Sequence, residues 1–357
     1  MKIGVLKETS DRRVSLTPSS IPKLTAQGFE IVVEQSAGSS AGFADVLYEE
    51  AGAKCIDRSS LLKQATILSS IHPLSSAELA SLQAGTNLIA LFEPFNDSEI
   101  SESLKKQELI GYSMDMIPRT TLAQSMDVLS SMASIAGYQA VLLGAFRLPR
   151  YLPMMITAAG SIRPAMVLVL GAGVAGLQAI ATAKRLGATV EAFDVRQAAK
   201  EEVQSLGAKF IEVEGAKDDS EAGGYAVEQS EDFLKRQRAK VQERAAKADI
   251  IITTALVRGR KSPILLPAST VKQMKPGSVV VDLAASGGGN CELTKNGETI
   301  EAHGVTIIGN SNLANEMPED ASTLYSNNLV NYLKLFVQDG QWAPDPENEI
   351  IKASRIA

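Results

Sequence analysis

Three glycines and one aspartate give this chain its clearest chemical signal. An apolar run over 166–170 is followed by Gly171, Gly173 and Gly176, a helical segment begins there, and Asp194 ends the next apolar run. In a nucleotide-binding turn, the first glycine allows the tight turn, the second lets backbone amides approach a pyrophosphate, and the third lets helix and strand pack closely. The helix N-terminus adds partial positive charge for the phosphates. The spacing therefore predicts a dinucleotide site in which the carboxylate accepts both ribose hydroxyls.

The acid at the end of the second apolar run also favours one cofactor. A carboxylate at Asp194 can accept from the ribose hydroxyls of NAD(H) and would repel the 2′-phosphate of NADP(H). Arg196 could pair with such a phosphate. Because the neighbouring acid would still repel it, NAD(H) is the predicted cofactor.

Composition narrows the class of protein. The 357 residues are enough for two domains, and 45% are hydrophobic, as in a globular protein with a large core. A net charge of −6 without a basic tract gives no electrostatic footprint for nucleic acid, so no such partner is expected. Residues 165–183 are apolar enough to resemble a membrane span, but the central glycines divide them into a strand and a helix. No direct membrane insertion is therefore expected.

The N-terminus and the cysteines indicate the compartment. The chain begins with a predicted strand and shows no signal-peptide pattern. Cys55 and Cys291 are far apart and lack the spacing of metal ligands. We therefore expect two inert buried thiols, no metal site and a reducing cytosolic setting.

Two series of alternating strands and helices predict the fold. The first series has strands at 2–6, 30–33, 66–69, 88–91 and 110–113, with a helix from Thr17 to Gln27 that Gly28 ends. The second has strands at 166–170, 189–193, 208–212, 249–253, 278–282 and 305–309.

A long helical segment over 125–146 joins the two series, and another apolar helical period covers 321–337. The last segment comes too late to belong to the second sheet, so we expect it to pack on the first domain. The prediction is an α/β protein with two Rossmann-like, doubly wound parallel-sheet domains, the first of them discontinuous. Their expected bounds are 1–126 with 320–357, a linking helix at 127–147, and 148–319.

One acidic segment, 214–232, interrupts the second series and carries three glycines. It fits a solvated surface loop. It equally fits a lid in which Gly223 and Gly224 form the hinge and Tyr225 covers a cofactor.

The glycine-rich run 171–188 with Asp194 and Arg196 closely resembles the NAD(H)-binding domain I of proton-translocating nicotinamide nucleotide transhydrogenases. A second match is similar to that family's Arg-Gln-Asp-Ser signature and lies over 116–131. Further matches cover 222–225, 252–256, 274–284 and 288–291, so the resemblance spans nearly the whole chain. Alanine dehydrogenase is a related family that shares the opening segments 3–8 and 13–18.

The resemblance implies positioning roles for the signature residues rather than acid–base chemistry. Arg119 would hold the pyrophosphate or nicotinamide arm, Gln124 would orient the nicotinamide, and Asp127 and Ser130 would bind the carboxamide or ribose. The last three lie three residues apart at a predicted helix start, so they could share one face; a helix-capping set is the alternative interpretation. The implied cofactor-binding set is Arg119, Thr120, Thr121, Gln124, Asp127, Ser130, Gly171, Gly173, Val174, Gly176, Asp194, Val195, Arg196, Gly224, Tyr225, Gln237 and Leu256, supported by Tyr138.

An amino-acid dehydrogenase would need something more, because oxidising its substrate releases a proton that a positioned base must take. In sequences similar to alanine dehydrogenase, a lysine, a histidine and an aspartate fall where this chain has Ile71, Glu93 and Ser286. Arg13 is retained. The histidines, His72 and His303, have no partner nearby in the sequence, and neither is expected to be catalytic.

The resemblance implies an NAD(H)-binding subunit that passes hydride from NADH to NADP⁺ held on a partner polypeptide, by positioning alone. It also implies a homodimer that is cytoplasmic and peripheral to the inner membrane. The dimer would dock on membrane-embedded and NADP(H)-binding subunits that couple the reaction to proton translocation. Two alternatives stay open: an NAD-dependent dehydrogenase of the alanine type, and an NAD(H)-sensing binding module.

Overall fold

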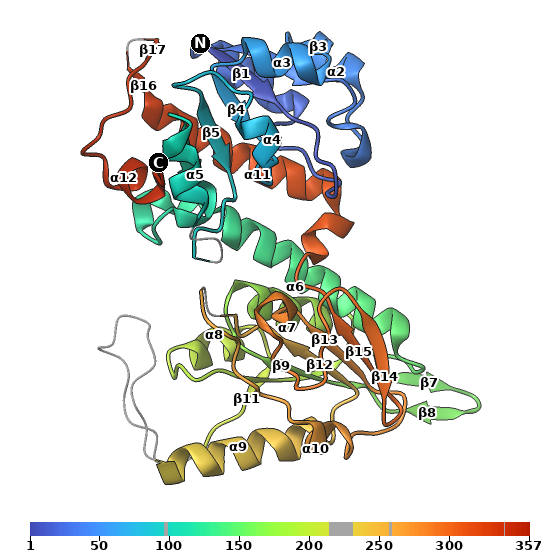
Figure 1. Ribbon diagram of the computed structural model, residues 1–357. Helices are drawn as coiled ribbons and strands as arrows, with labels where there is room; N and C mark the ends of the chain where they lie inside the picture. The colour runs from blue at the N-terminus through green and yellow to red at the C-terminus, as the bar shows by residue number, and fades with distance from the viewer. Residues whose placement is uncertain (96–98, 214–230, 257–258, 339) are drawn as a thin grey trace. The chain divides into compact units, whose positions relative to one another are not determined.

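Two compact units make up the protein. The computed structural model describes residues 1–95, 99–213, 231–256, 259–338 and 340–357. Unit 1 contains Met1–Met132 and Ala314–Ala357, and unit 2 contains Ala133–Leu313. In Figure 1 the red C-terminal helix α11 lies among the blue N-terminal elements of unit 1. The first domain is therefore discontinuous, as the sequence predicts.

Unit 1 is built on a parallel sheet of six strands in the order β3-β2-β1-β4-β5-β6. This order is that of a doubly wound dinucleotide-binding fold. The strands are β1 (Lys2–Val5), β2 (Glu30–Glu34), β3 (Lys54–Ile56), β4 (Ile67–Ser69), β5 (Asn87–Ala90) and β6 (Ile110–Ser113).

Short helices surround this sheet. The predicted helix over 17–27 is wrong in its extent, because a 3-10 turn precedes a short α-helix that ends at Thr25. The Thr17 side chain makes no capping bond to it, and its hydroxyl lies 3.1 Å from Ser19 Oγ instead. The helical elements before the long central helix are η1 (Pro18–Ser20), α1 (Ile21–Thr25), η2 (Ser39–Ala41), α2 (Asp45–Glu50), α3 (Arg58–Gln64), α4 (Ser76–Leu79), α5 (Ile100–Lys106), η3 (Met114–Met116) and η4 (Thr121–Met126).

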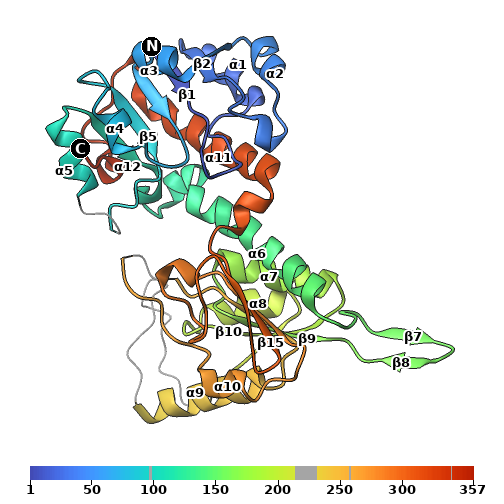
Figure 2. The ribbon, with the colours of Figure 1, turned by 45° about the vertical axis from the view of Figure 1, so that its right-hand side comes forward.

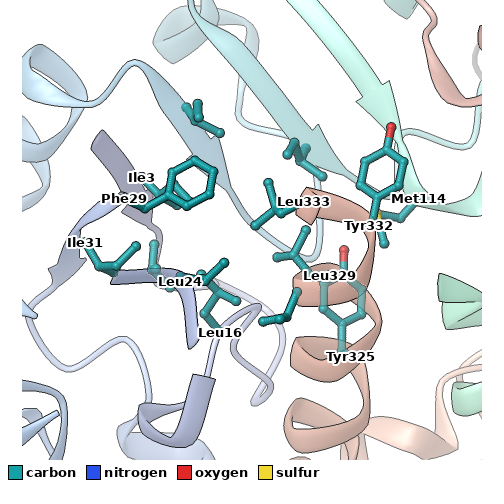
Figure 3. Packing of buried hydrophobic residues seen from close by; sticks show 14 of the residues in the cluster. Ile3, Leu16, Leu24, Phe29, Ile31, Met114, Tyr325, Leu329, Tyr332 and Leu333 are labelled. Carbon is teal, nitrogen blue, oxygen red and sulfur yellow. The ribbon is translucent and has the colours of Figure 1, made fainter. Parts of the chain in front are cut away.

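The C-terminal segment completes the core of unit 1. Helix α11 (Pro318–Leu333) buries Tyr325, Leu329 and Leu333 in the same hydrophobic cluster as Ile3 of β1 and Ile31 of β2, and Figure 3 shows part of this cluster. Burying each such side chain is worth roughly 1.5–3 kcal/mol, which explains why the sheet holds so distant a segment. The remaining C-terminal elements are η7 (Lys334–Phe336), β16 (Val337–Gln338), β17 (Gln341–Trp342) and α12 (Glu349–Ser354).

Unit 2 contains a seven-stranded sheet in the order β11-β10-β9-β12-β13-β15-β14. Its first six strands are parallel, and β14 pairs antiparallel at the edge. The sequence predicts the six parallel strands and misses β14, whose residues are exposed or half-buried. The strands are β9 (Met166–Leu170), β10 (Thr189–Phe193), β11 (Lys209–Phe210), β12 (Ile250–Thr253), β13 (Val279–Asp282), β14 (Thr299–Ala302) and β15 (Val305–Gly309).

A separate hairpin of β7 (Met155–Thr157) and β8 (Gly160–Ile162) also belongs to unit 2. Figure 2 shows it extending away from the sheet of that unit. The helical elements of unit 2 are α7 (Val174–Arg185), α8 (Ala199–Ser205), α9 (Glu231–Ala245), α10 (Ala268–Val271) and η5 (Ala285–Gly287). The 3-10 helix η6 (Leu313–Glu316) begins at the last residue of unit 2 and continues into unit 1.

The longest helix, α6 (Val128–Arg147), contains the division between the units, which falls after Met132. Its N-terminal residues pack in the core of unit 1, and Ala140 and Val141 pack in the core of unit 2. Among the described residues, α6 is the one helix long and apolar enough to cross a membrane by length and composition. The apolar stretch 165–183 is no such helix, because it forms β9, a turn and most of α7.

Candidate functional site

The turn between β9 and α7 needs glycine at two positions. Gly171 has φ +103°, and a Cβ there would lie 2.4 Å from Thr254 Oγ1. A Cβ on Gly176 would lie 1.9 Å from the carbonyl oxygen of Gly171. Any larger residue would therefore separate the helix from its own strand.

Gly173 has a different role, because a Cβ there would meet nothing within 4 Å. It is the N-cap of α7, and no side chain caps the helix. The first N–H groups of an uncapped helix need an acceptor from outside, and they carry the positive end of the helix dipole. The open space above Gly173 and these N–H groups fit the pyrophosphate of a dinucleotide. Val174, the first residue of α7, is exposed beside it.

Asp194 is buried at the end of β10 and fastens the glycine turn. Its Oδ2 accepts from Ala172 N at 2.7 Å, and its Oδ1 accepts from Arg196 N at 2.9 Å. The Arg196 guanidinium donates two further hydrogen bonds, from Nε to Oδ1 at 3.0 Å and from Nη2 to Oδ2 at 3.1 Å. A carboxylate has about four acceptor positions. All of these positions are occupied, so a ribose hydroxyl could bind Asp194 only by displacing a donor of Arg196. Val195, between the two residues in the sequence, is exposed.

The glycine turn lies where the strand order of unit 2 changes direction. From β9 the sheet runs through β10 on one side and β12 on the other, and ligands bind at the carboxyl ends of strands at such a point. Thr254 follows β12 and its hydroxyl donates to Gly171 O at 3.1 Å. Leu256 lies two residues further on and is 53% exposed. The turn after β9 and the segment after β12 are thus directly joined.

The structure describes only the end of the segment 214–232, which the sequence predicts as a surface loop or a lid. Gly224 and Tyr225 lie outside the described residues. Residues 231 and 232, which the sequence assigns to the lid, form the first turn of α9. Gln237 is half-buried on this helix, and Arg244 near its end forms an ion pair with buried Glu191 of β10.

The signature residues of unit 1 surround a break between two helices. Arg119, Thr120, Thr121 and Gln124 are exposed, and the 3-10 helix η4 ends at Met126. The α-helix predicted from residue 125 begins instead at Val128.

Asp127 explains this break. Its Oδ1 accepts from Ser130 N at 2.9 Å and its Oδ2 from Ser130 Oγ at 2.6 Å, as in an N-cap. Asp127 and Ser130 therefore form a helix cap, which leaves the predicted cofactor role of these residues untested. The expected helical face shared with Gln124 is wrong, because Gln124 belongs to the preceding 3-10 helix.

Residues distant in the sequence contact α6 both at its start and further along it. No local pattern in the sequence predicts these contacts. Asn328 of α11 donates to Ser125 O at 2.8 Å and accepts from Ser131 Oγ at 2.7 Å, so it holds the chain on both sides of the break. Further along α6, a Cβ on Gly137 would lie 2.1 Å from Ala175 O in the first turn of α7. Tyr138 follows this close contact and is partly exposed.

The carboxyl edge of the unit 1 sheet carries a buried charge cluster. Asp11 Oδ1 accepts from Arg13 Nε and Asp11 Oδ2 from His72 Nε2, both at 2.9 Å. Burial raises the pKa of Asp11, but hydrogen bonds from Arg13 and His72 and the arginine charge hold this pKa well below its usual range. The hydrogen bond to Asp11 raises the pKa of His72 against the effect of burial. His72 thus has no partner nearby in the sequence, and the fold supplies a distant one in Asp11.

Of the three positions that matter for a dehydrogenase, Ile71 and Ser286 offer no base, whereas Glu93 is a carboxylate and keeps that alternative open. Ile71 is fully buried, and its N–H donates to Glu8 Oε1 at 2.6 Å. Glu93 is exposed and has a φ of +48°. Its backbone N–H donates a hydrogen bond to Asp115 Oδ1 at 3.3 Å. Ser286 is exposed in η5. His303 lies in the turn between β14 and β15.

The two thiols differ in burial. Cys291 is buried as expected, whereas Cys55 is only half-buried, because it lies on the edge strand β3. Burial raises the pKa of both, to about 11 for Cys55. Both thiols are therefore protonated at neutral pH and poor nucleophiles.

Two family models cover most of the chain. The model described as alanine dehydrogenase/PNT, N-terminal domain, matches residues 4–136, and the corresponding C-terminal domain model matches residues 140–357. The second model crosses from unit 2 into the C-terminal segment of unit 1.

Individual relatives narrow this family. The chain is 45% identical to an NAD(P) transhydrogenase alpha-subunit protein of Rhodospirillum rubrum, over 93% of this chain and 89% of that protein. A solved transhydrogenase structure from Sinorhizobium meliloti matches with a TM-score of 0.92 and 42% identity, covering 99% of this chain and 98% of that one. An L-alanine dehydrogenase structure matches with a TM-score of 0.80 and 28% identity, covering 99% and 93%. The chain therefore belongs to the NAD(P) transhydrogenase alpha-subunit family, a family of oxidoreductases that shares its fold with alanine dehydrogenase.

Proposed function

We propose that this chain is the NAD(H)-binding component of a proton-translocating NAD(P) transhydrogenase, exchanging hydride with NADP(H) bound on a partner subunit. The observation that carries the proposal is the open, uncapped turn at Gly173, beside a buried acid at Asp194, in a chain so similar to a transhydrogenase alpha subunit. NADH supplies the hydride when bound. The residues of this chain bind and orient.

In this proposal the residues of unit 2 hold the adenosine and pyrophosphate parts. The N–H groups at the start of α7 bind the phosphates, and Asp194 accepts ribose hydroxyls after Arg196 moves aside. Exposed Val174 and Leu256 provide apolar contact for the adenosine. Gly224, Tyr225 and Gln237 belong to the proposed set on the resemblance alone.

The signature of unit 1 is proposed to contact the nicotinamide part. Arg119 offers a charged donor and Gln124 a carboxamide, and both are exposed. The Asp127–Ser130 cap keeps the backbone of this segment in one place, which is what a positioning role requires. Thr120 and Thr121 complete the set. No proton is transferred, so none of these groups acts as an acid or base.

The chain is further proposed to form a homodimer that docks, from the cytoplasmic side, on membrane-embedded and NADP(H)-binding subunits. The β7–β8 hairpin supports a dimer, because a lone two-stranded hairpin is marginally stable. This one exposes the apolar side chains of Ile156 and Ile162, and Met154 is exposed directly before it. Light scattering after size-exclusion chromatography should give twice the chain mass, and Ile156→Lys should give the monomer mass. A wild-type monomer at tens of micromolar would contradict the dimer.

One assay tests the proposed function against its two alternatives. The purified chain is mixed with NADH, an oxidised NADP analogue and the NADP(H)-binding component of a transhydrogenase, then separately with NAD⁺ and alanine. Analogue reduction that requires the partner supports the proposal. Alanine-dependent NADH formation by the chain alone indicates a dehydrogenase, and NADH binding without turnover in either mixture indicates a sensing module.

A further inference from the structure

Asp282, the last residue of β13, organises the segment that follows it in unit 2. Its side chain is fully buried, and Oδ1 accepts from Ala284 N at 3.0 Å. Its Oδ2 accepts from Asn290 N at 2.8 Å, Cys291 N at 3.0 Å and Thr294 Oγ1 at 2.7 Å. One carboxylate therefore satisfies four donors and sets the path of residues 284–294.

Asn290 connects this segment to the one after β12. It is fully buried, and its Oδ1 accepts from Ala255 N at 2.9 Å. Its Nδ2 donates to Ala255 O and to Pro263 O, both at 2.9 Å. The carboxamide therefore binds both the N–H and the carbonyl of one peptide residue, as a neighbouring strand would. Asparagine alone among the small side chains offers both groups at that reach.

The residue held in this way stands between two that face the dinucleotide site. Thr254 precedes Ala255 and binds the carbonyl of Gly171, and Leu256 follows it with its side chain exposed. Leu256 also borders η5, because a Cβ on Gly287 would lie 3.1 Å from Leu256 Cδ1. The backbone at Ala255 thus sets the position of two side chains: that of Thr254, which binds the carbonyl of Gly171, and that of Leu256.

We infer that Asn290 is a positioning residue for the dinucleotide site, which holds Ala255 so that Thr254 closes on Gly171 and Leu256 presents its side chain to the cofactor. The inference rests on the proposed NAD(H) binding. Asn290 acts through the peptide at Ala255 and need not touch the cofactor. Its effect should therefore appear in affinity and KM for NADH, with a smaller effect on kcat.

The decisive variant is Asn290→Asp, which keeps the shape but replaces the amide donor with a carboxylate oxygen facing two carbonyls. We expect NADH to bind about tenfold or more weakly at about pH 8, because a hydrogen-bonded pair becomes a repulsive one. Burial and the two carbonyls raise the pKa of the introduced acid, and its protonated form can donate again. Affinity should therefore recover partly at about pH 6 in this variant, and not in the wild type.

Asp249 provides the matched control, because it is a buried acid at the opposite end of the same sheet. It accepts from Met166 N at 2.8 Å, Lys275 Nζ at 2.9 Å and Arg150 Nη1 at 3.1 Å. Asp249→Asn should lower the melting temperature about as much as Asn290→Asp while leaving the Kd for NADH within about twofold of wild type.

The outcomes separate the inference from the proposed function. A wild-type chain that fails to bind NADH would overturn both. Wild-type affinity in Asn290→Asp, or equal weakening in Asp249→Asn, would overturn the inference alone. Isothermal titration calorimetry with NADH measures each Kd. If Asn290→Asp does not fold, Asn290→Ser decides in its place: a Kd raised about threefold or more supports the inference, and an unchanged Kd rejects it.

Discussion

The two sheets share their strand order over six strands but differ at their carboxyl edges. In unit 1 the segment after β1 leads to Asp11, whose buried carboxylate pairs with buried Arg13 and with partly exposed His72. In unit 2 the segment after β9 is a glycine turn with open space at Gly173. One edge satisfies its own charges, and the other leaves donors for a ligand. A shared fold therefore gives no site by itself, and the residues at the strand ends decide.

Glycine placement shows the same contrast. Gly4 lies inside β1, where a Cβ would come within 2.6 Å of Leu61 Cδ2, so it serves the packing of α3 on the sheet. In unit 2 the glycines lie after the strand, in the turn itself. A glycine in the strand interior permits a close helix, whereas glycines in the turn permit a close phosphate.

The largest expected effect comes from breaking the closed edge of unit 1. Asp11→Ala removes a carboxylate that buried Arg13 and His72 share, and removing one partner of a buried ion pair costs about 3–5 kcal/mol. Urea unfolding should show this loss for the variant. Arg12→Ala is the control, because its 3.7 Å bridge to Glu316 is exposed and should contribute less than about 1 kcal/mol. Equal stability of the two variants would contradict a closed, self-satisfied edge.

A pair of glycine variants tests the open edge of unit 2. Gly176→Ala places a Cβ 1.9 Å from a carbonyl oxygen, so we expect about 1–3 kcal/mol of destabilisation together with loss of NADH binding. Gly173→Ala has room, so its melting temperature should match wild type, while its Kd for NADH rises about tenfold as the added methyl group keeps the phosphates away. Calorimetry and titration measure both quantities. Wild-type affinity in Gly173→Ala would show that no phosphate approaches there.

Asp194→Asn should change the choice between cofactors. Removing the negative charge weakens acceptance from ribose hydroxyls and frees Arg196 to meet a 2′-phosphate. Loss of charged hydrogen bonds worth about 1.5–3 kcal/mol corresponds to a Kd for NADH raised roughly ten- to a hundredfold, with NADPH binding improved. Parallel titrations with NADH and NADPH measure this. An unchanged ratio of the two Kd values would remove Asp194 from the specificity argument.

The smallest expected effect is a pH dependence in unit 1. Because the hydrogen bond to Asp11 raises the pKa of His72 in the folded chain, its stabilisation is complete below the unfolded value of about 6.5 and is lost as pH rises through the folded pKa. The ring is partly exposed, so water screening limits this to about 0.5 kcal/mol. His72→Gln should flatten the free energy of unfolding across this pH range and leave NADH binding unchanged. A slope identical to wild type would show that another group titrates.

Prediction succeeded where a short piece of chain carries its own signal. The strands over 110–113, 166–170, 189–193 and 305–309 have the predicted bounds. The run over 166–170 is continuously apolar, as in a buried parallel strand. Prediction failed at β3, β14 and the β7–β8 hairpin, which are short and largely exposed. The helix predicted from residue 125 begins at Val128, because Asp127 caps it there, and the apolar pattern of the sequence does not mark that boundary.

The two α/β series, the glycine turn and the acid that follows it can be predicted from the chain alone, because backbone freedom, burial pattern and turn chemistry are local properties. Which polar residues bind one another depends on the three-dimensional packing. Asp11 meets His72, Asn290 holds Ala255, and Asn328 bridges the break at Asp127. These partners are separated by tens to hundreds of residues, and an asparagine carries no local mark of whether it will be buried. Only the packing of the sheets and helices brings each donor to its acceptor.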